Sequence, residues 1–158
     1  MIKLSEILTE EYIKINFSAK SKDDLIKRMI KIIEKSPYVL DIEKVEEAVF
    51  TRERSVTTGI GNGLALPHAK TDGVTENIVA LAITDKPIDF DSADELPVRI
   101  VFLLVGKDST LHLKFLSRFS NLIKDEESRQ KLIDAKSAKE VYAIIKNAED
   151  IKIEPTSI

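Results

Sequence analysis

The chain has 158 residues, with 24 basic and 27 acidic side chains and a formal net charge of −3. This mildly acidic balance disfavours nucleic acid as a partner, because binding to a phosphate backbone needs a surplus of basic side chains. The absence of cysteine excludes disulfides, thiolate nucleophiles and cysteine-ligated metal centres. We therefore expect a cytoplasmic protein whose imidazole chemistry depends on two histidines, His68 and His112.

No segment of the sequence predicts insertion into a membrane. The N-terminal stretch MIKLSEILTEEY mixes charges with apolar residues and has no signal-peptide core. The longest run of aliphatic and aromatic residues, 100–105, is far too short to span a bilayer. We expect no direct membrane insertion, so that any role in a membrane process depends on contact with a partner.

The first third of the chain predicts a strand followed by two helices. Residues 13–17 alternate apolar and polar side chains, which indicates a half-buried strand. Ser21 is a typical N-cap for a helix over about 22–35. Asp41 then opens a second helix, which is expected to end near Arg54.

The next segment is rich in glycine. It begins at Gly59 and reads GIGNGLALPH. Clustered glycines mark backbone that adopts positive φ or comes close to another group. A short strand is predicted to follow them and to deliver His68 at its end, because alternate leucines precede the Pro-His pair.

Two buried strands are predicted in the middle of the chain. Residues 78–83 and 98–105 are apolar without alternation, which is typical of strands covered on both faces. Lys86 and Pro87 are expected to break the pattern between them.

Helices are predicted for the remaining chain. Ser109 is expected to cap a helix that carries His112 at its N3 position, in the first turn. A short helix follows near residues 125–133, and Ser137 with Glu140 forms a capping box for the last helix.

The order of these elements predicts the fold class. Helices and strands are mixed along one chain, which favours a single-domain α/β sandwich with a central mixed sheet and helices on both faces. We expect the domain to occupy residues 1–148 and a frayed tail to occupy 149–158, which lacks a periodic pattern and contains Pro155.

Common catalytic and nucleotide-binding motifs are missing. The sequence has no P-loop, no nucleophile elbow and no HExxH, and the glycine cluster departs from the dinucleotide spacing. Two histidines far apart in the sequence give little support for a metal site. We therefore expect neither a metal nor another cofactor.

Three side chains remain as candidates for chemistry, each with an ordinary alternative. A neutral His68 keeps a lone pair that acts as nucleophile or base, although a histidine after proline is more often a turn residue. His112 lies on the apolar stripe of its helix and is either a hydrogen-bonded core histidine or a donor to an anion at the helix N-terminus. Arg52 either lies in solvent at the end of its helix or turns inward, where its planar guanidinium fits a phosphate.

Residues 51–70, TRERSVTTGIGNGLALPHAK, resemble a family signature. They are similar to enzyme IIA domains of the fructose–mannitol family of the bacterial phosphoenolpyruvate-dependent sugar phosphotransferase system. That pattern joins an Arg-Glu pair, a Thr-Gly-x-Gly-x-Gly stretch and a Pro-His at fixed spacing. The likeness continues through residues 87–90 (PIDF) and 100–105 to the His112-Leu113 pair.

The resemblance implies a role for each candidate residue. His68 resembles the phosphorylated histidine, His112 the second active-site histidine and Arg52 the arginine beside the phosphoryl group. Asn62 and Leu111 depart from residues that some members carry, which leaves the subtype open. The loop implied to bring its backbone to the phosphate consists of Gly59, Gly61, Asn62 and Gly63.

The resemblance also implies a phosphotransferase component with a phosphohistidine intermediate. The protein would accept phosphate from the phosphorylated carrier HPr and pass it to a IIB protein or domain for sugar uptake. We expect an apolar ring of Ile60, Leu64 and Leu66 around His68 to dock these partners, with a core position as the alternative for each residue.

Two other functions stay open. The same family includes nitrogen-regulatory homologues, which suggests a module that acts through phosphorylation-dependent protein binding. Residues 67–71 and 118–129 look nearer to the fructose type. Outside the family, the chain would be a small binding domain whose glycine loop holds an anion.

Overall fold

The computed structural model describes residues 3–153, with the side chains of 109–111, 152 and 153 left out of the description. A mixed six-stranded sheet forms its centre, with strand order β1-β5-β6-β3-β2 and with β4 also paired to β6. The strands are β1 (Ile13–Phe17), β2 (Gly59–Gly61), β3 (Leu64–Ala65), β4 (His68–Lys70), β5 (Ile78–Ile88) and β6 (Val98–Gly106). Strand β6 runs antiparallel to β5 and parallel to β3 and β4. The predicted mixed sheet is therefore confirmed.

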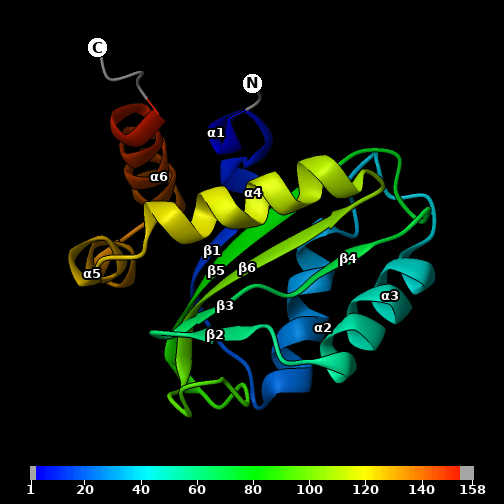
Figure 1. The fold of residues 1–158 in the computed structure, drawn as a ribbon, viewed down its shortest axis with the longest axis horizontal. Helices are drawn as coiled ribbons and strands as arrows, with labels where there is room; N and C mark the ends of the chain where they lie inside the picture. The colour runs from blue at the N-terminus through cyan, green and yellow to red at the C-terminus, as the bar shows by residue number, and fades with distance from the viewer. Residues whose placement is uncertain (1–2, 154–158) are drawn as a thin grey trace.

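Helices cover both faces of this sheet (Figure 1), as the sequence predicts. The helical elements are α1 (Leu4–Ile7), the 3-10 turn η1 (Glu10–Tyr12), α2 (Lys22–Ile33), α3 (Ile42–Ser55), α4 (Ser109–Leu122), α5 (Glu126–Asp134) and α6 (Ala138–Ile153). Helices α2 and α3 contribute to one hydrophobic core, and α1, α4, α5 and α6 contribute to the other. The chain thus forms an α/β sandwich with two cores.

Strand β6 separates the two cores, which explains its unbroken apolar sequence. Its successive side chains point to opposite faces because the side-chain period of a strand is two. Leu103 packs into the core beneath α2 and α3, whereas Phe102 and Leu104 pack into the other core. There Phe102 stacks on Phe119 of α4 with ring centroids 4.2 Å apart. This contact holds α4 on the sheet.

Three of the predicted helix caps are present in the structure. The hydroxyl of Ser21 accepts a hydrogen bond from the amide of Asp24 at 3.2 Å, and Asp41 accepts from two amides of α3. Ser137 accepts from the amide of Glu140, which itself accepts from the amide of residue 136. These bonds satisfy amides that have no partner within their own helix.

The predicted break at Lys86 and Pro87 is wrong. Strand β5 continues through both residues to Ile88, with a register irregularity between Ile83 and Ile88. Around this irregularity the hydroxyl of Thr84 donates to the carbonyl of Lys86 at 2.8 Å. Proline is tolerated there because it lies where regular pairing with β6 is already interrupted.

The predicted frayed tail is wrong from Glu149 to Ile153, where helix α6 continues. Glu149 is fully buried and accepts hydrogen bonds from the amide of Leu4 at 2.6 Å and from the amide and hydroxyl of Ser5 at 3.1 and 2.9 Å. Its carboxylate thereby caps α1, so a contact between the two ends of the domain orders this part of the chain. The other predicted tail residues, 154–158, lie outside the described residues.

Replacing Glu149 by alanine is expected to lower the free energy of unfolding by about 2 kcal/mol, because buried donors lose a charged acceptor. Urea unfolding followed by circular dichroism measures the change. Asp150→Ala is the matched control, since Asp150 lies next on α6 but pairs with Lys3 at the surface, 3.0 Å away. Equal effects of the two substitutions would contradict the capping role of Glu149.

Candidate functional site

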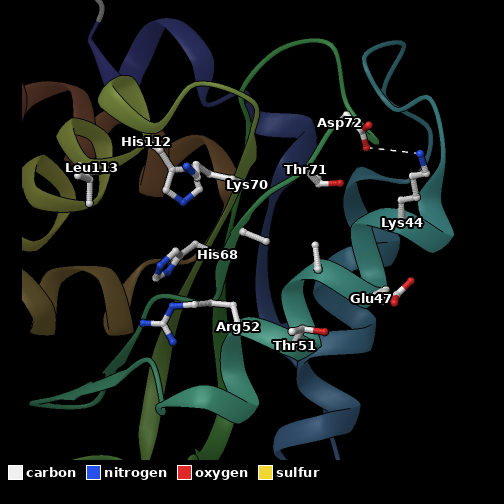
Figure 2. A pocket seen from close by; sticks show the side chains of 12 residues that line it. Lys44, Glu47, Thr51, Arg52, His68, Lys70, Thr71, Asp72, His112 and Leu113 are labelled. Atoms are coloured by element: carbon white, nitrogen blue, oxygen red, sulfur yellow. Dashed lines mark hydrogen bonds and ion pairs between the residues drawn. The ribbon is translucent and has the colours of Figure 1, made fainter.

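The structure brings Arg52, His68 and His112 together from three separate elements. Arg52 lies near the end of α3, His68 begins β4 and His112 lies near the start of α4. All three line a cavity of about 730 Å³ (Figure 2). The imidazole ring centroids of His68 and His112 lie 5.2 Å apart at an interplanar angle of 59°. The two imidazole rings therefore border the same cavity.

His68 begins a strand of its own, whereas the sequence predicts it at the end of the preceding one. Strand β3 ends at Ala65, and β4 then pairs with β6 in parallel, with His68 opposite Leu104. Pro67 lies between the two strands and has no amide hydrogen to continue the ladder. Its carbonyl still accepts from the amide of Leu104 at 3.1 Å, which fixes the backbone directly before the histidine.

A backbone hydrogen bond sets the tautomer of His68. Its Nδ1 lies 2.7 Å from the carbonyl oxygen of Leu66. A carbonyl only accepts, so Nδ1 carries the proton and Nε2 keeps its lone pair. Burial lowers the pKa of His68, and the nearby charge of Arg52 lowers it further, while the bond to Leu66 opposes both. His68 is therefore a neutral imidazole with Nε2 available as a nucleophile.

His112 is a buried histidine whose ring has no hydrogen-bond partner within the described part of the chain. Its exposed fraction is 3%, and neither ring nitrogen forms a hydrogen bond to a described residue. A core histidine normally has such a bond, because an unpaired buried polar atom costs free energy. The ring lines the cavity beside His68, so its unpaired nitrogens favour the binding of a ligand that forms hydrogen bonds with them.

Helix α4 begins one residue earlier relative to His112 than the sequence predicts. The carbonyl of Asp108 accepts from the amide of His112 at 3.1 Å, so Asp108 stands at the cap and Ser109 is the first helical residue. His112 is thus in the fourth helical position instead of N3. Because its backbone amide bonds within the helix, only its imidazole is available to a bound group.

The pKa of His112 makes stability depend on pH. Burial lowers this pKa from 6.5 to about 4, with smaller contributions from His68 and Lys70. Between these two pH values the unfolded chain binds a proton that the folded protein does not, so stability is lost as pH falls. Over the whole window the loss amounts to about 3 kcal/mol.

Urea unfolding of the protein and of His112→Leu at pH 7 and pH 5 measures this dependence. The substitution is expected to reduce the loss of stability on going to pH 5, because leucine does not titrate. His68 is present in both proteins, so its own contribution cancels in the comparison. Equal losses in the two proteins would contradict a buried neutral His112.

Arg52 is partly buried near the end of α3 and lines the cavity next to His68. Its Nη1 donates to the carbonyl of Val56 at 2.7 Å, and the guanidinium lies beside the His68 ring (Figure 2). Arg54 behaves differently, because it is exposed and its guanidinium lies over the ring of Phe50, 5.7 Å from the centroid. Of these two arginines, Arg52 is thus the one that lines the cavity, where a planar guanidinium has the shape to bind a phosphate.

The glycine segment forms a turn between two strands, and its role as a phosphate-binding loop stays a prediction. Its residues form β2 and the turn to β3, where Gly61, Asn62 and Gly63 adopt positive φ. The amide of Asn62 donates to Asp94 at 2.9 Å, and the amide of Gly59 donates to Thr57 at 3.1 Å. These glycines serve a tight turn, and none of them is among the residues that line the cavity.

The predicted apolar ring is largely wrong. Leu64 and Leu66 are buried and belong to the core beneath α4, whereas Ile60 is half exposed. Alternating leucines in a short strand are typical of a buried face as well as of a docking surface. The sequence pattern therefore did not separate a core position from a docking role.

Sequence reasoning missed Glu53, which lies next to Arg52 and is 6% exposed. The Arg-Glu pair was the available signal, but adjacent helix residues do not face each other, so the pair did not show where the carboxylate points. The far end of the cavity was also missed. There Lys44 lies 3.5 Å from Asp72, near Glu47.

The described residues contain neither a metal site nor a membrane-spanning helix. Across residues 3–153, no group of three or more histidine, cysteine, aspartate or glutamate residues could hold a metal ion. No helix within the described range is long and apolar enough to cross a bilayer.

The fold and the site define the class of protein. A family model described as the EIIA 2 component of the phosphoenolpyruvate-dependent sugar phosphotransferase system matches residues 6–148. This chain belongs to that family, and it is a phosphotransferase component with the phosphoryl-carrier function of enzyme IIA.

Relatives come from both transport and regulatory systems. The chain is 35% identical over 146 residues to the fructose-specific EIIABC component of Bacillus subtilis, covering 91% of this chain and 23% of that relative. It thus spans about a quarter of that protein's length. The structure of the nitrogen regulatory protein IIA-Ntr from Neisseria meningitidis matches with a TM-score of 0.84 at 33% identity, covering 90% of this chain and 98% of that one.

A second similar structure contains a partner. It is the complex of the mannitol enzyme IIA with phosphorylated enzyme IIB from Escherichia coli. The TM-score is 0.79 at 22% identity, over 89% of this chain and 97% of that one. At this identity the likeness shows a shared fold.

Proposed function

We propose that this protein is the IIA component of a fructose-type sugar phosphotransferase system and that His68 carries the phosphoryl group. The donor is phosphorylated HPr, and the acceptor is a IIB protein or domain. The observation that carries the proposal is the free Nε2 lone pair of His68 in a cavity shared with Arg52 and His112. The fructose-specific relative supports the sugar class, and the mannitol IIA–IIB complex supports the acceptor.

The transfer proceeds by in-line displacement at phosphorus. The Nε2 lone pair of His68 forms a new P–N bond while the P–N bond of the donor phosphohistidine breaks, and the donor imidazole leaves with that electron pair. In the second step a nucleophile of IIB forms its bond to phosphorus, and the electron pair of the breaking P–N bond returns to Nε2. Such a reaction depends on alignment and on stabilising the charge of the phosphoryl oxygens.

Arg52 and His112 supply this stabilisation. The guanidinium of Arg52 lies beside the His68 ring and keeps its charge at every physiological pH. His112 is neutral, because burial lowers its pKa to about 4, so its imidazole offers one N–H donor to a phosphoryl oxygen. A neutral His112 also adds no further positive charge next to the phosphorylated ring of His68, whose Nδ1 already carries a proton.

The test is to incubate the purified protein with phosphorylated HPr and to locate the phosphate by mass spectrometry at neutral or alkaline pH. Phosphate on His68 is the expected result, and phosphate on any other residue would overturn the assignment. Addition of the IIB partner should then remove the label. Retention of phosphate in the presence of active IIB would favour the nitrogen-regulatory type of output.

A further inference from the structure

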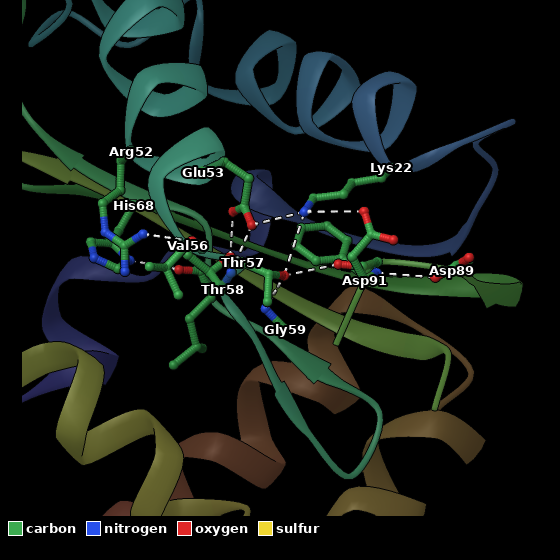
Figure 3. Close-up of polar contacts among 12 residues, drawn as sticks. Lys22, Arg52, Glu53, Val56, Thr57, Thr58, Gly59, His68, Asp89 and Asp91 are labelled. Atoms are coloured by element: carbon green, nitrogen blue, oxygen red, sulfur yellow. Dashed lines mark hydrogen bonds and ion pairs between the residues drawn. The ribbon is translucent and has the colours of Figure 1, made fainter. Parts of the chain in front are cut away.

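The buried carboxylate of Glu53 closes the turn that follows helix α3. Its two oxygens accept hydrogen bonds from the amide of Thr58 at 2.6 Å and from the hydroxyl of Thr58 at 2.5 Å (Figure 3). The side chain is 4% exposed, so these bonds form away from water. Hydrogen bonds to a buried charge are among the stronger ones in a protein. Glu53 therefore fixes the path of the backbone from α3 into β2.

The carbonyl that holds Arg52 lies within this turn. Val56 accepts from Nη1 of Arg52 at 2.7 Å, two residues before the Thr58 that Glu53 binds. Between them, the hydroxyl of Thr57 donates to the carbonyl of Phe90 at 2.9 Å. The turn is thus attached both to its own helix and to the neighbouring loop, and the Val56 carbonyl has a defined position.

Lys22 balances the charge of Glu53. Its Nζ lies 3.1 Å from the carboxylate and 4.7 Å from the centroid of the Phe90 ring. Neighbouring side chains on a helix point in different directions, so Glu53 faces Lys22 while Arg52 faces His68. The carboxylate is therefore paired with the lysine, while the guanidinium of Arg52 donates to the Val56 carbonyl through Nη1.

We propose that Glu53 is a positioning residue for phosphoryl transfer, which acts by holding the Val56 carbonyl and, through it, the guanidinium of Arg52 beside His68. This inference rests on the proposed function of His68. Loss of the Thr58 contacts is expected to slow transfer about tenfold, because small misplacement of an aligned charged group is costly for a displacement reaction.

A matched pair of double variants separates the effect of the hydrogen bonds to Thr58 from the effect of charge. Lys22→Met with Glu53→Gln removes both charges, but the amide still accepts from the Thr58 N–H and donates to its hydroxyl. Lys22→Met with Glu53→Ala has the same net charge and loses both contacts. Neither variant leaves a buried charge unpaired, and circular dichroism checks that both are folded.

Two measurements are made on each variant. The first is the rate of phosphoryl transfer from phosphorylated HPr, with and without an added Arg52→Ala substitution. The second is ¹⁵N NMR relaxation of the Arg52 Nε–H group, which reports how rigidly the guanidinium is held. We expect the glutamine variant to retain most of the rate and a rigid Arg52. We expect the alanine variant to lose about tenfold in rate and to show a mobile Arg52.

The added Arg52→Ala substitution separates a positioning role from a general structural one. If Glu53 acts through Arg52, its loss has no further effect once Arg52 is absent. Equal losses with and without Arg52, or equal Arg52 relaxation in the two double variants, would overturn the proposal. If phosphorylated HPr labels no protein at all, the proposed function fails, and the relaxation measurement still decides whether Glu53 holds Arg52.

Discussion

Alanine in place of His68 is expected to abolish acceptance of phosphate from phosphorylated HPr, with a loss of at least about a thousandfold, because the nucleophile itself is removed. Transfer of ³²P or the mass shift of the intact protein measures this loss. His68 is only partly buried and lies outside both hydrophobic cores, so the fold should survive. An unchanged thermal unfolding profile would establish this.

The control for His68 is substitution of the second imidazole. His112→Ala keeps the nucleophile, so it should still take up phosphate on His68, but more slowly. Labelling of the His68→Ala variant at a rate near that of the wild-type protein would contradict the assignment of His68 as the phosphorylated residue. Labelling that moves to another residue would do the same.

Replacing Arg52 by alanine is expected to slow phosphoryl transfer about a hundredfold, since one preorganised charged donor to the transferring group is lost. Single-turnover kinetics with phosphorylated HPr measures the rate of transfer apart from binding. Arg52→Lys should recover only part of the rate, because an ammonium group lacks the planar fork of the guanidinium.

Arg54 offers a matched control on the same helix. It carries the same charge two residues further along the chain, yet it is exposed and lies over Phe50. Arg54→Ala should therefore change the rate by less than about twofold, as most exposed substitutions have small effects. Similar losses from the two alanine variants would show that general positive charge matters instead of the placement of Arg52.

Periodic patterns predicted the fold well, and they failed where a tertiary contact overrides local preference. The apolar runs of β5 and β6 predicted strands covered on both faces, as the two cores require. The pattern did not show that β5 passes through Pro87, because an irregular register is a property of two strands together. It also did not show that Glu149 is buried, because its partners lie at the other end of the chain.

The candidate site was predictable only in part for a similar reason. Arg52, His68 and His112 were identified from residue type and from a family signature, and the structure places them together. The role of the glycine cluster could not be decided from the sequence, since positive φ serves a tight turn as well as it serves a bound phosphate. Glu53 was missed because its importance depends on Thr58 and Lys22, which approach it only after folding.

The bond from His68 to the carbonyl of Leu66 also has an evolutionary consequence. The proton on Nδ1 is fixed by a peptide oxygen, and peptide oxygens are the same whichever amino acid occupies the position. Side chains around the ring can therefore diverge to suit new partners without disturbing the tautomer of the histidine. Such an arrangement is compatible with the use of one fold by fructose-specific phosphotransferase components and by nitrogen regulatory proteins.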